Sequence, residues 1–356
     1  MARVGEDRGC LFDGYSAFSK VARSRALGAI VAAVLLIPLL LASSAFAAPA
    51  AAIDASTKHL WLAPHLDVYE DTTGKLDLAG VTSPQTAERF TPYDGRVGPN
   101  LAYTSSTLWA RFAIENASDA PIERWLVVDT PFVENIEVFR DGEPPAVQGV
   151  LHPRSERELP RRSYSFRIAL APHQTRTVHV RCWGYAEIML PLQLWELGAL
   201  GEADQQLTTF AALCLGVMLA MAIYNAFLFL YIRDRAHLYY AGYVIGIGLW
   251  CMSIDGSLLA VLPERVQITP HWVNLVTFFP GVVLAGLFVR EILGLPASHR
   301  RLDWVLLASL VLLLPGPLAY LLGLIDYRIQ NVVVRPTIIA AMLVQIVAHW
   351  CAGATA

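Results

Sequence analysis

Long apolar runs with few charges fill the C-terminal part of the chain. Five of them approach the roughly 20 mostly apolar residues that one helix needs to cross a bilayer core. They are Phe210–Ile232, Leu238–Leu262, Val273–Val289, Trp304–Leu324 and Val332–Trp350. The pattern predicts an α-helical transmembrane bundle over residues 206–351, in which about five spans are present.

The segment in front of these runs alternates apolar and polar residues, which is typical of half-buried strands. The strand candidates are Thr107–Glu115, Arg124–Asp129, Asn135–Arg140, Ser163–Leu170 and Thr175–Trp183. Turn-forming sequences separate them, and we expect no helix among them. The spacing predicts an all-β, jelly-roll-like domain over residues 48–200.

The first 47 residues have the pattern of a secretory signal peptide. Basic residues precede the apolar stretch Leu27–Leu41, and Ala45–Ala47 has the small-x-small pattern of a cleavage site. A first transmembrane helix is the competing interpretation, but the stretch is short and contains Pro38. We therefore predict a signal peptide at residues 1–47 and an exported β domain.

The charge of the exported segment limits its partners. Residues 48–205 contain 14 Lys and Arg against 21 Asp and Glu, which gives a formal net charge of −7. Such acidity argues against nucleic acid or an anionic lipid surface as the partner of this domain. Its remaining expected partners are an unknown small molecule or periplasmic ligand, with the bilayer around the helices.

The chain shows no pattern of metal ligands or catalytic groups. Cys182 is the one cysteine in the exported segment, so an intrachain disulfide cannot form there. The histidines of the segment lack metal-ligand spacing, and no hydrolase, P-loop or dinucleotide motif is present. We predict no metal, no cofactor and no catalytic residue. The five histidines are His59, His65, His152, His173 and His179.

Aromatic residues of the β domain are the candidate ligand contacts, because sugars often stack on exposed rings. The candidates are Trp109, Trp125, Trp183 and Tyr185. Trp109 and Trp125 alternate with core-facing positions, so each of them faces outward or packs in the core of a second sheet.

A run of four arginines is the other candidate site. It is interpreted either as a solvated loop, because Glu156 and Glu158 interleave it, or as an anion-binding site. Its members are Arg154, Arg157, Arg161 and Arg162.

Polar residues inside apolar spans are candidates for function, because lipid burial of such groups is costly. Asn225, Asp255, Asn274 and Arg335 fall in this class. Asp255 and Arg335 lie toward the outer ends of their spans and are expected either to pair or to line a cavity. The alternative is that Asp255 begins a loop with Gly256 and that Arg335 reaches the interface.

Arginines between the spans set the orientation. With the β domain outside, the inner loops carry more arginines than the outer ones, as the positive-inside rule requires. The inner ones are Arg233, Arg235, Arg290, Arg300 and Arg301, and the outer ones are Arg265 and Arg328.

Several segments in order resemble the bacterial seven-transmembrane receptors with diverse intracellular signalling modules. In the β domain these are Leu66–Gly74, Asn100–Asn116 and Leu190–Trp195; in the membrane part they are Tyr224–Phe229 and Asp255–Gly256. The resemblance covers about residues 60–350 and implies an exported type 2 sensor domain, seven helices and an output module. It also implies the bacterial inner membrane, a periplasmic N-terminal domain and homodimers.

The chain departs from that pattern at its end, where two helices and an output module such as a diguanylate cyclase or histidine kinase are missing. We expect a truncated or frame-shifted product, and not an enzyme. The predicted function is the ligand-binding, signal-transmitting part of a sensory receptor, possible ligands being carbohydrates. The alternatives are a transporter or channel subunit and a membrane-anchored binding protein that does not signal.

Overall fold

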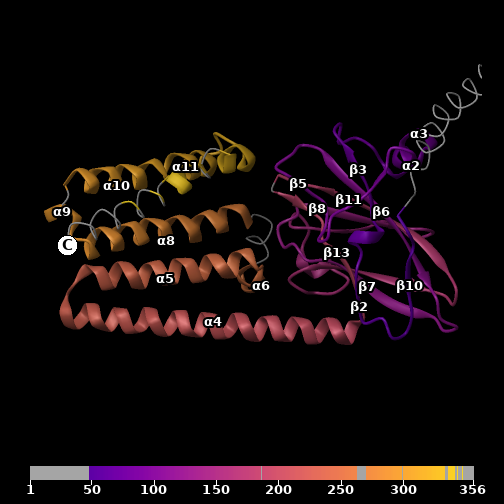
Figure 1. Ribbon diagram of the computed structural model, residues 1–356, viewed down its shortest axis with the longest axis horizontal. Coiled ribbons are helices and arrows are strands. Elements are labelled where there is room, and N and C mark those ends of the chain that lie inside the picture. The colour runs from indigo at the N-terminus through magenta and orange to yellow at the C-terminus, as the bar shows by residue number, and fades with distance from the viewer. Residues whose placement is uncertain are drawn as a thin grey trace, which may run out of the picture. The chain divides into compact units, whose positions relative to one another are not determined.

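Strands come first along the chain and helices follow (Figure 1). This computed structural model describes residues 48–347 except 186, 263–269, 299, 333–335, 341–342 and 344–346. The signal peptide predicted for residues 1–47 lies outside the described residues. The all-β region followed by a helical region agrees with the fold class expected from the sequence.

Two main sheets form the β domain. The larger has the order β4-β3-β6-β11-β8-β9, with β1 parallel to β6, and the smaller has the order β10-β7-β13-β2. The larger contains β1 Ala51–Ile53, β3 Asp67–Asp71, β4 Thr91–Pro92, β6 Thr107–Asn116, β8 Asn135–Arg140, β9 Ala146–Gln148 and β11 Thr175–Trp183. The smaller contains β2 His59–Trp61, β7 Ile122–Val128, β10 Tyr164–Leu170 and β13 Leu192–Trp195. A short pair joins β5 Asn100–Ala102 to β12 Ile188–Met189, and single turns of 3-10 helix occur at Ala63–His65 and Arg154–Glu156.

One hydrophobic core joins the inner faces of the two sheets. Phe112 and Ile114 of β6 meet Phe166 and Ile168 of β10, and none of the four side chains is more than 2% exposed. Burial of each such side chain stabilises the fold by about 1.5–3 kcal/mol. The alternation along β6 and β10 therefore predicted correctly which residues face the core.

The expectation that no helix interrupts the strands was wrong. The helices α2 Leu78–Thr82 and α3 Pro84–Ala87 lie between β3 and β4. Asp77 caps α2, because its carboxylate accepts a hydrogen bond of 2.8 Å from the backbone N–H of Gly80. These helices are too short to show a helical period, yet Val81 of α2 joins the hydrophobic cluster that covers the outer face of β6.

The first membrane helix begins on the β domain. Helix α4 runs for 36 residues over Leu197–Ile232, which corresponds to about 54 Å at 1.5 Å per residue and exceeds the roughly 30 Å bilayer core. Leu200 in its first turn is 3% exposed and lies in a cluster with Trp125 and Val127 of β7. Asp204, one turn later, forms an ion pair with Arg161.

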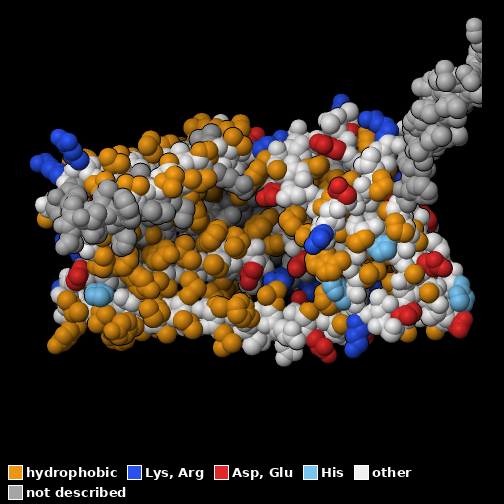
Figure 2. Space-filling view, in the orientation of Figure 1, with side chains coloured by type: hydrophobic (Ala, Val, Ile, Leu, Met, Phe, Trp, Pro, Cys, Tyr) orange, Lys and Arg blue, Asp and Glu red, His pale blue; other side chains and the backbone are white. Residues whose placement is uncertain are grey.

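The helical part continues with helices that pack side by side (Figure 1). They are α5 Arg235–Ile254, α6 Ser257–Val261, α8 Pro270–Ile292, α9 Leu295–Ser298, α10 Arg300–Leu312 and α11 Pro315–Leu321. Apolar side chains cover much of the visible surface of these helices (Figure 2). Exposed apolar surface on this scale is typical of a surface that a membrane or a protein partner covers.

Three stretches of the described residues are long and apolar enough to cross a membrane: Leu197–Ile232, Leu275–Ile292 and Arg300–Leu321. They match the first, third and fourth predicted runs. The second predicted run is divided at Gly256 into α5, which packs against α4 and α8, and the short α6. Most of the fifth run lies outside the described residues. The fourth run is divided into α10 and α11 before Pro315, because proline has no N–H to continue a helix.

Candidate ligand-binding cleft

A hollow on the β domain lies over the outward face of the smaller sheet. It has a volume of about 740 Å³. The strands β7 and β10 form its floor, since Trp125 pairs with Arg167 and Glu123 pairs with Ala169 across them. We call it the Trp125 cleft. Its lining residues are Glu123, Trp125, Arg140, Glu143, Glu158, Arg167 and Ala169.

Ion pairs across the Trp125 cleft hold its charged side chains. The Arg167 guanidinium lies 2.7 Å from the Glu123 carboxylate. The Arg140 guanidinium lies 3.0 Å from Glu143 and 3.1 Å from Glu158. The Arg167–Glu123 pair is exposed, and such pairs contribute little to stability, so its donors and acceptors can exchange partners with a polar ligand at small cost. The Arg140 side chain is only 9% exposed and is held more firmly.

Trp125 belongs both to the cleft and to the contact with the first membrane helix. Its side chain is 7% exposed and packs with Val127 and Leu200, beside the partly buried Leu159 and Trp195. Its indole N–H is buried and has no hydrogen-bond partner among the described residues. Trp125 therefore contacts both the cleft and the first turn of α4.

The other predicted aromatic residues lie elsewhere. Trp109 is 0% exposed and packs with Val81 and Phe90 under the α2–α3 segment, so no ligand reaches it in this structure. Trp183 and Tyr185 form an edge-on ring pair with centroids 6.2 Å apart, and Tyr185 is 51% exposed. Neither lines the Trp125 cleft. The four candidates thus occupy three places, and a role of Trp183 and Tyr185 in binding stays a prediction.

Sequence reasoning missed a row of aromatic and polar side chains beside Trp125. The His59 ring stacks on Trp195 with a centroid distance of 3.9 Å. Gln193 Oε1 lies 2.9 Å from His59 Nε2 and accepts a hydrogen bond of 3.0 Å from the Trp195 indole N–H. Trp61 next to them is 40% exposed. The alternation His59–Trp61 and Leu192–Trp195 contained the signal, because strand residues two apart share a face.

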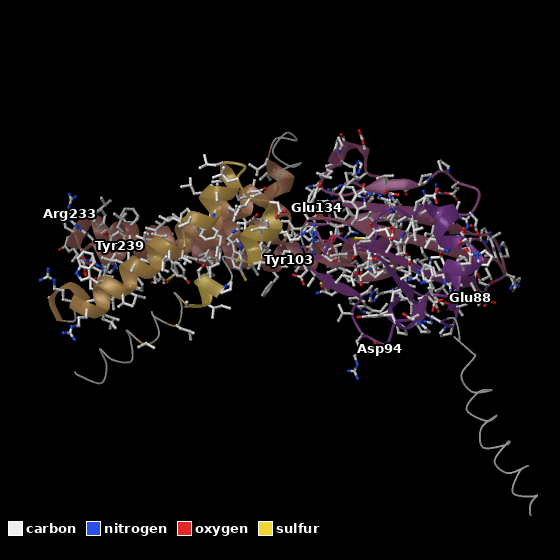
Figure 3. The ribbon with its side chains drawn as sticks, turned by 90° about the horizontal axis from the view of Figure 1, so that it is seen from above. Glu88, Asp94, Tyr103, Glu134, Arg233 and Tyr239 are labelled. Atoms are coloured by element: carbon white, nitrogen blue, oxygen red, sulfur yellow. The ribbon has the colours of Figure 1, made fainter. Side chains whose placement is uncertain are left out.

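The polar residues predicted inside the membrane differ in their positions and contacts. Asn225 is buried, and its side-chain oxygen lies 3.0 Å from His237 Nδ1, which ties α4 to α5. Arg233 and Tyr239 lie near this junction, at the same end of the helices (Figure 3).

Asp255 ends α5, and its carboxylate accepts a hydrogen bond of 2.7 Å from the Ser257 N–H. This is the loop-starting role that was the alternative to a pair with Arg335. Asn274 lies in α8. Arg335 lies outside the described residues, so its pairing with Asp255 stays a prediction.

Buried titratable groups in the β domain have structural surroundings. Complete burial raises the pKa of the Cys182 thiol, which leaves it protonated and unreactive. Burial, followed by the charge of Arg111, lowers the pKa of His179. The described residues contain no group of three His, Cys, Asp or Glu side chains that could hold a metal ion.

Two family models match the chain in tandem. The model described as 7TMR-DISM extracellular 2 matches residues 63–196. The model described as 7TM diverse intracellular signalling matches residues 207–354. No functionally curated protein matches the sequence.

Likeness to solved structures is weak. An exo-β-1,3-galactanase from Phanerochaete chrysosporium, solved with galactose, is 13% identical, with 29% of this chain and 27% of that chain covered and a TM-score of 0.16. A GH31 α-xylosidase from Xanthomonas citri is 14% identical, with 40% and 17% covered and a TM-score of 0.17. This chain thus spans less than two thirds of either protein, and scores this low support no argument.

The two family matches occupy the same positions as the two structural parts. The sensor model covers the strands from the 3-10 turn Ala63–His65 to β13. The membrane model begins within α4, after the turns that contact the β domain. The chain therefore belongs to the 7TMR-DISM family, the membrane receptors with an extracellular sensor domain and a seven-transmembrane region.

Proposed function

We propose that this chain is the sensory and membrane part of a receptor, which binds a ligand in the Trp125 cleft and passes the change inward through α4. The observation that supports this is the double position of Trp125, which lines the cleft and packs on Leu200 of α4. A continuous helix of 36 residues begins at this contact. In a bacterial cell, the β domain would face the periplasm and the helices would cross the inner membrane.

A carbohydrate fits the cleft best. Sugar hydroxyls both donate and accept hydrogen bonds, and the cleft offers guanidinium donors on Arg140 and Arg167 beside carboxylate acceptors on Glu123 and Glu158. The volume of about 740 Å³ lies in the range of small-molecule sites. A neutral ligand leaves the charge balance of the cleft unchanged, whereas an anion or a cation of similar size would change it.

Transmission through α4 follows from the contacts at its start. A ligand that displaces Arg167 or reorients Trp125 changes the surface on which Leu200 packs. The ion pair between Arg161 and Asp204 fixes the next turn of the same helix to the β domain. A population shift in the β domain therefore has a mechanical route into the membrane.

The binding test uses the full chain in lipid nanodiscs and a panel of neutral oligosaccharides, with thermal stabilisation as the first readout. Arg167→Gln removes one donor of the cleft, and Arg96→Gln, an exposed arginine outside it, is the matched control. A charge-assisted hydrogen bond contributes about 1.5–3 kcal/mol. Arg167→Gln should therefore weaken binding at least about tenfold, and Arg96→Gln should not.

Transmission has its own readout. Hydrogen exchange of the α4 amides after residue 200 should change on ligand addition, and Leu200→Ala should abolish this change while binding persists. If no oligosaccharide stabilises the chain, the carbohydrate assignment is wrong. If Arg167→Gln and Arg96→Gln bind equally well, the ligand occupies another place.

A further inference from the structure

A second, smaller cleft lies where the β domain meets the turn between α5 and α6. Gly256 forms this turn with φ of +80°, and a Cβ atom on it would lie 3.0 Å from the Cβ of Pro131. Helix α5 packs between α4 and α8, both of which contain candidate spans. The turn thus marks the level of a membrane surface. We call the hollow the arginine cleft; it is lined by Pro131, Val150, His152, Arg154, Arg157, Arg162 and Gly256.

Arg157 lines the arginine cleft, and no carboxylate among the described residues forms an ion pair with it. Its guanidinium lies over the Tyr164 ring at 4.7 Å and donates a hydrogen bond of 2.7 Å to the backbone carbonyl of Arg161. Its Nε atom is buried and has no hydrogen-bond partner among the described residues. Burial, and in part the charge of Arg154, lowers the pKa of Arg157. The guanidinium is thus fixed and short of negative charge.

The neighbouring arginines add to this excess. Arg154 donates a hydrogen bond of 3.3 Å to the carbonyl of Pro160, and no ion pair described for the β domain includes Arg154 or Arg157. Arg162 lies 3.8 Å from the Asp129 carboxylate, the longest such distance in the described ion pairs.

The acidic residues that interleave this run in the sequence do not neutralise it. Glu158 pairs with Arg140 and accepts a hydrogen bond of 2.7 Å from the Arg167 N–H. Glu156 is exposed. Arg161 and Arg162 of the run have carboxylate partners in Asp204 and Asp129, whereas no carboxylate partner is described for Arg154 or Arg157.

We propose that the arginine cleft binds the headgroup phosphate of an acidic phospholipid. Arginine is the preferred partner of phosphate because its planar fork matches two oxygens. The cleft has a volume of about 20 Å³, which holds about one water-sized group and no sugar ring, so a phosphate enters it with one oxygen and keeps the others at its mouth. Leu151, between the lining residues Val150 and His152, is 43% exposed, and Val261 of α6, the helix that follows Gly256, is 74% exposed. Both segments that meet at the cleft thus offer exposed apolar side chains to acyl chains.

The formal net charge of −7 on residues 48–205 does not prevent the arginine cleft from binding an acidic headgroup. Exposed charges farther away than the Debye length, about 8 Å at physiological salt, are largely screened. Within the loop, Glu158 is engaged by Arg140 and Arg167, so Asp129, 3.8 Å from Arg162, is the one carboxylate described in an ion pair with an arginine that lines the cleft. The proposal is independent of the ligand in the Trp125 cleft, because it requires only that the chain spans a membrane.

The test compares the thermal stability of the full chain in nanodiscs of phosphatidylcholine and in nanodiscs with half phosphatidylglycerol. The second should raise the unfolding midpoint by about 3 °C or more. The double variant Arg154→Gln/Arg162→Gln should lose at least half of this rise. Arg89→Gln/Arg96→Gln makes the same charge change at exposed positions outside the cleft and should keep it. Native mass spectrometry should show one phosphatidylglycerol fewer on the cleft variant.

Each other outcome overturns the proposal. Equal losses in the two double variants indicate a general electrostatic effect of the surface. Equal stabilisation by inorganic phosphate in detergent indicates a site for a soluble anion rather than for a lipid. If the cleft double variant does not fold, Arg154→Gln alone replaces it, since Arg154 donates only a long hydrogen bond to one carbonyl among its described contacts; an unchanged rise in that variant also contradicts the proposal.

Discussion

Truncation of Leu200 should release the start of α4 from the β domain. The side chain is 3% exposed, packed against Trp125 and Val127. Burial of a leucine contributes about 1.5–3 kcal/mol, and a cavity left by truncation adds to the loss. We expect Leu200→Ala to destabilise the contact by about 2–3 kcal/mol.

The matched control lies three residues earlier on the same helix. Leu197 is 50% exposed, so Leu197→Ala removes about half of the buried area, leaves no cavity and should cost about 1 kcal/mol or less. Both substitutions introduce the same residue, so helix propensity affects both in the same direction.

Hydrogen exchange of the amides at residues 201–206 measures the opening of this contact. A loss of 2 kcal/mol corresponds to exchange about 30-fold faster, and a loss of 1 kcal/mol to about fivefold faster. The experiment uses the full chain in nanodiscs, with the amides of α8 as an internal reference. Equal acceleration in Leu200→Ala and Leu197→Ala would refute the idea that Leu200 fixes α4 to the β domain.

Three further predictions concern the β domain. Asn116→Ala should lower the free energy of unfolding by about 3 kcal/mol in denaturant titrations. The reason is that the fully buried Asn116 amide donates hydrogen bonds to two backbone carbonyls at 2.8 and 2.9 Å. A loss below about 1 kcal/mol would contradict this. His179 has a lowered pKa in the fold, so the unfolded chain binds a proton first as the pH falls below about 6.5. Stability should therefore drop from that pH down to the lower folded pKa, and His179→Gln should flatten this part of the melting profile; an unchanged slope would exclude His179 as its source. Asp77→Ala should lower the free energy of unfolding by about 1 kcal/mol, because it removes the N-cap of α2. It should also make Trp109, which α2 covers, more accessible to a fluorescence quencher. Unaltered quenching would show that the cap does not hold α2 over Trp109.

The sequence by itself determined the order of the two parts and the direction of many side chains. Period-two alternation placed Phe112 and Ile168 on the inner faces of the sheets, because successive strand residues point to opposite sides. Apolar length placed the spans that begin with α4 and α8, because a bilayer sets a minimum helix length. Motif spacing pointed to the family that the two matched models now show.

The tertiary structure alone decided what covers the outward faces. Trp109 and Trp125 have the same alternation, yet α2 buries Trp109 completely while Trp125 lines a cleft and contacts α4. Alternation gives the side of the sheet but not the element that packs on it.

The sequence also did not reveal which charged residues form ion pairs with each other. Glu123 and Arg167 pair across neighbouring strands although they lie 44 positions apart in the sequence. Glu158 turns toward Arg140, which leaves Arg154 and Arg157 without a described carboxylate partner. Local spacing cannot reveal such pairs, because electrostatic interactions depend on distance in space, which only the packing of the two sheets and the helices fixes.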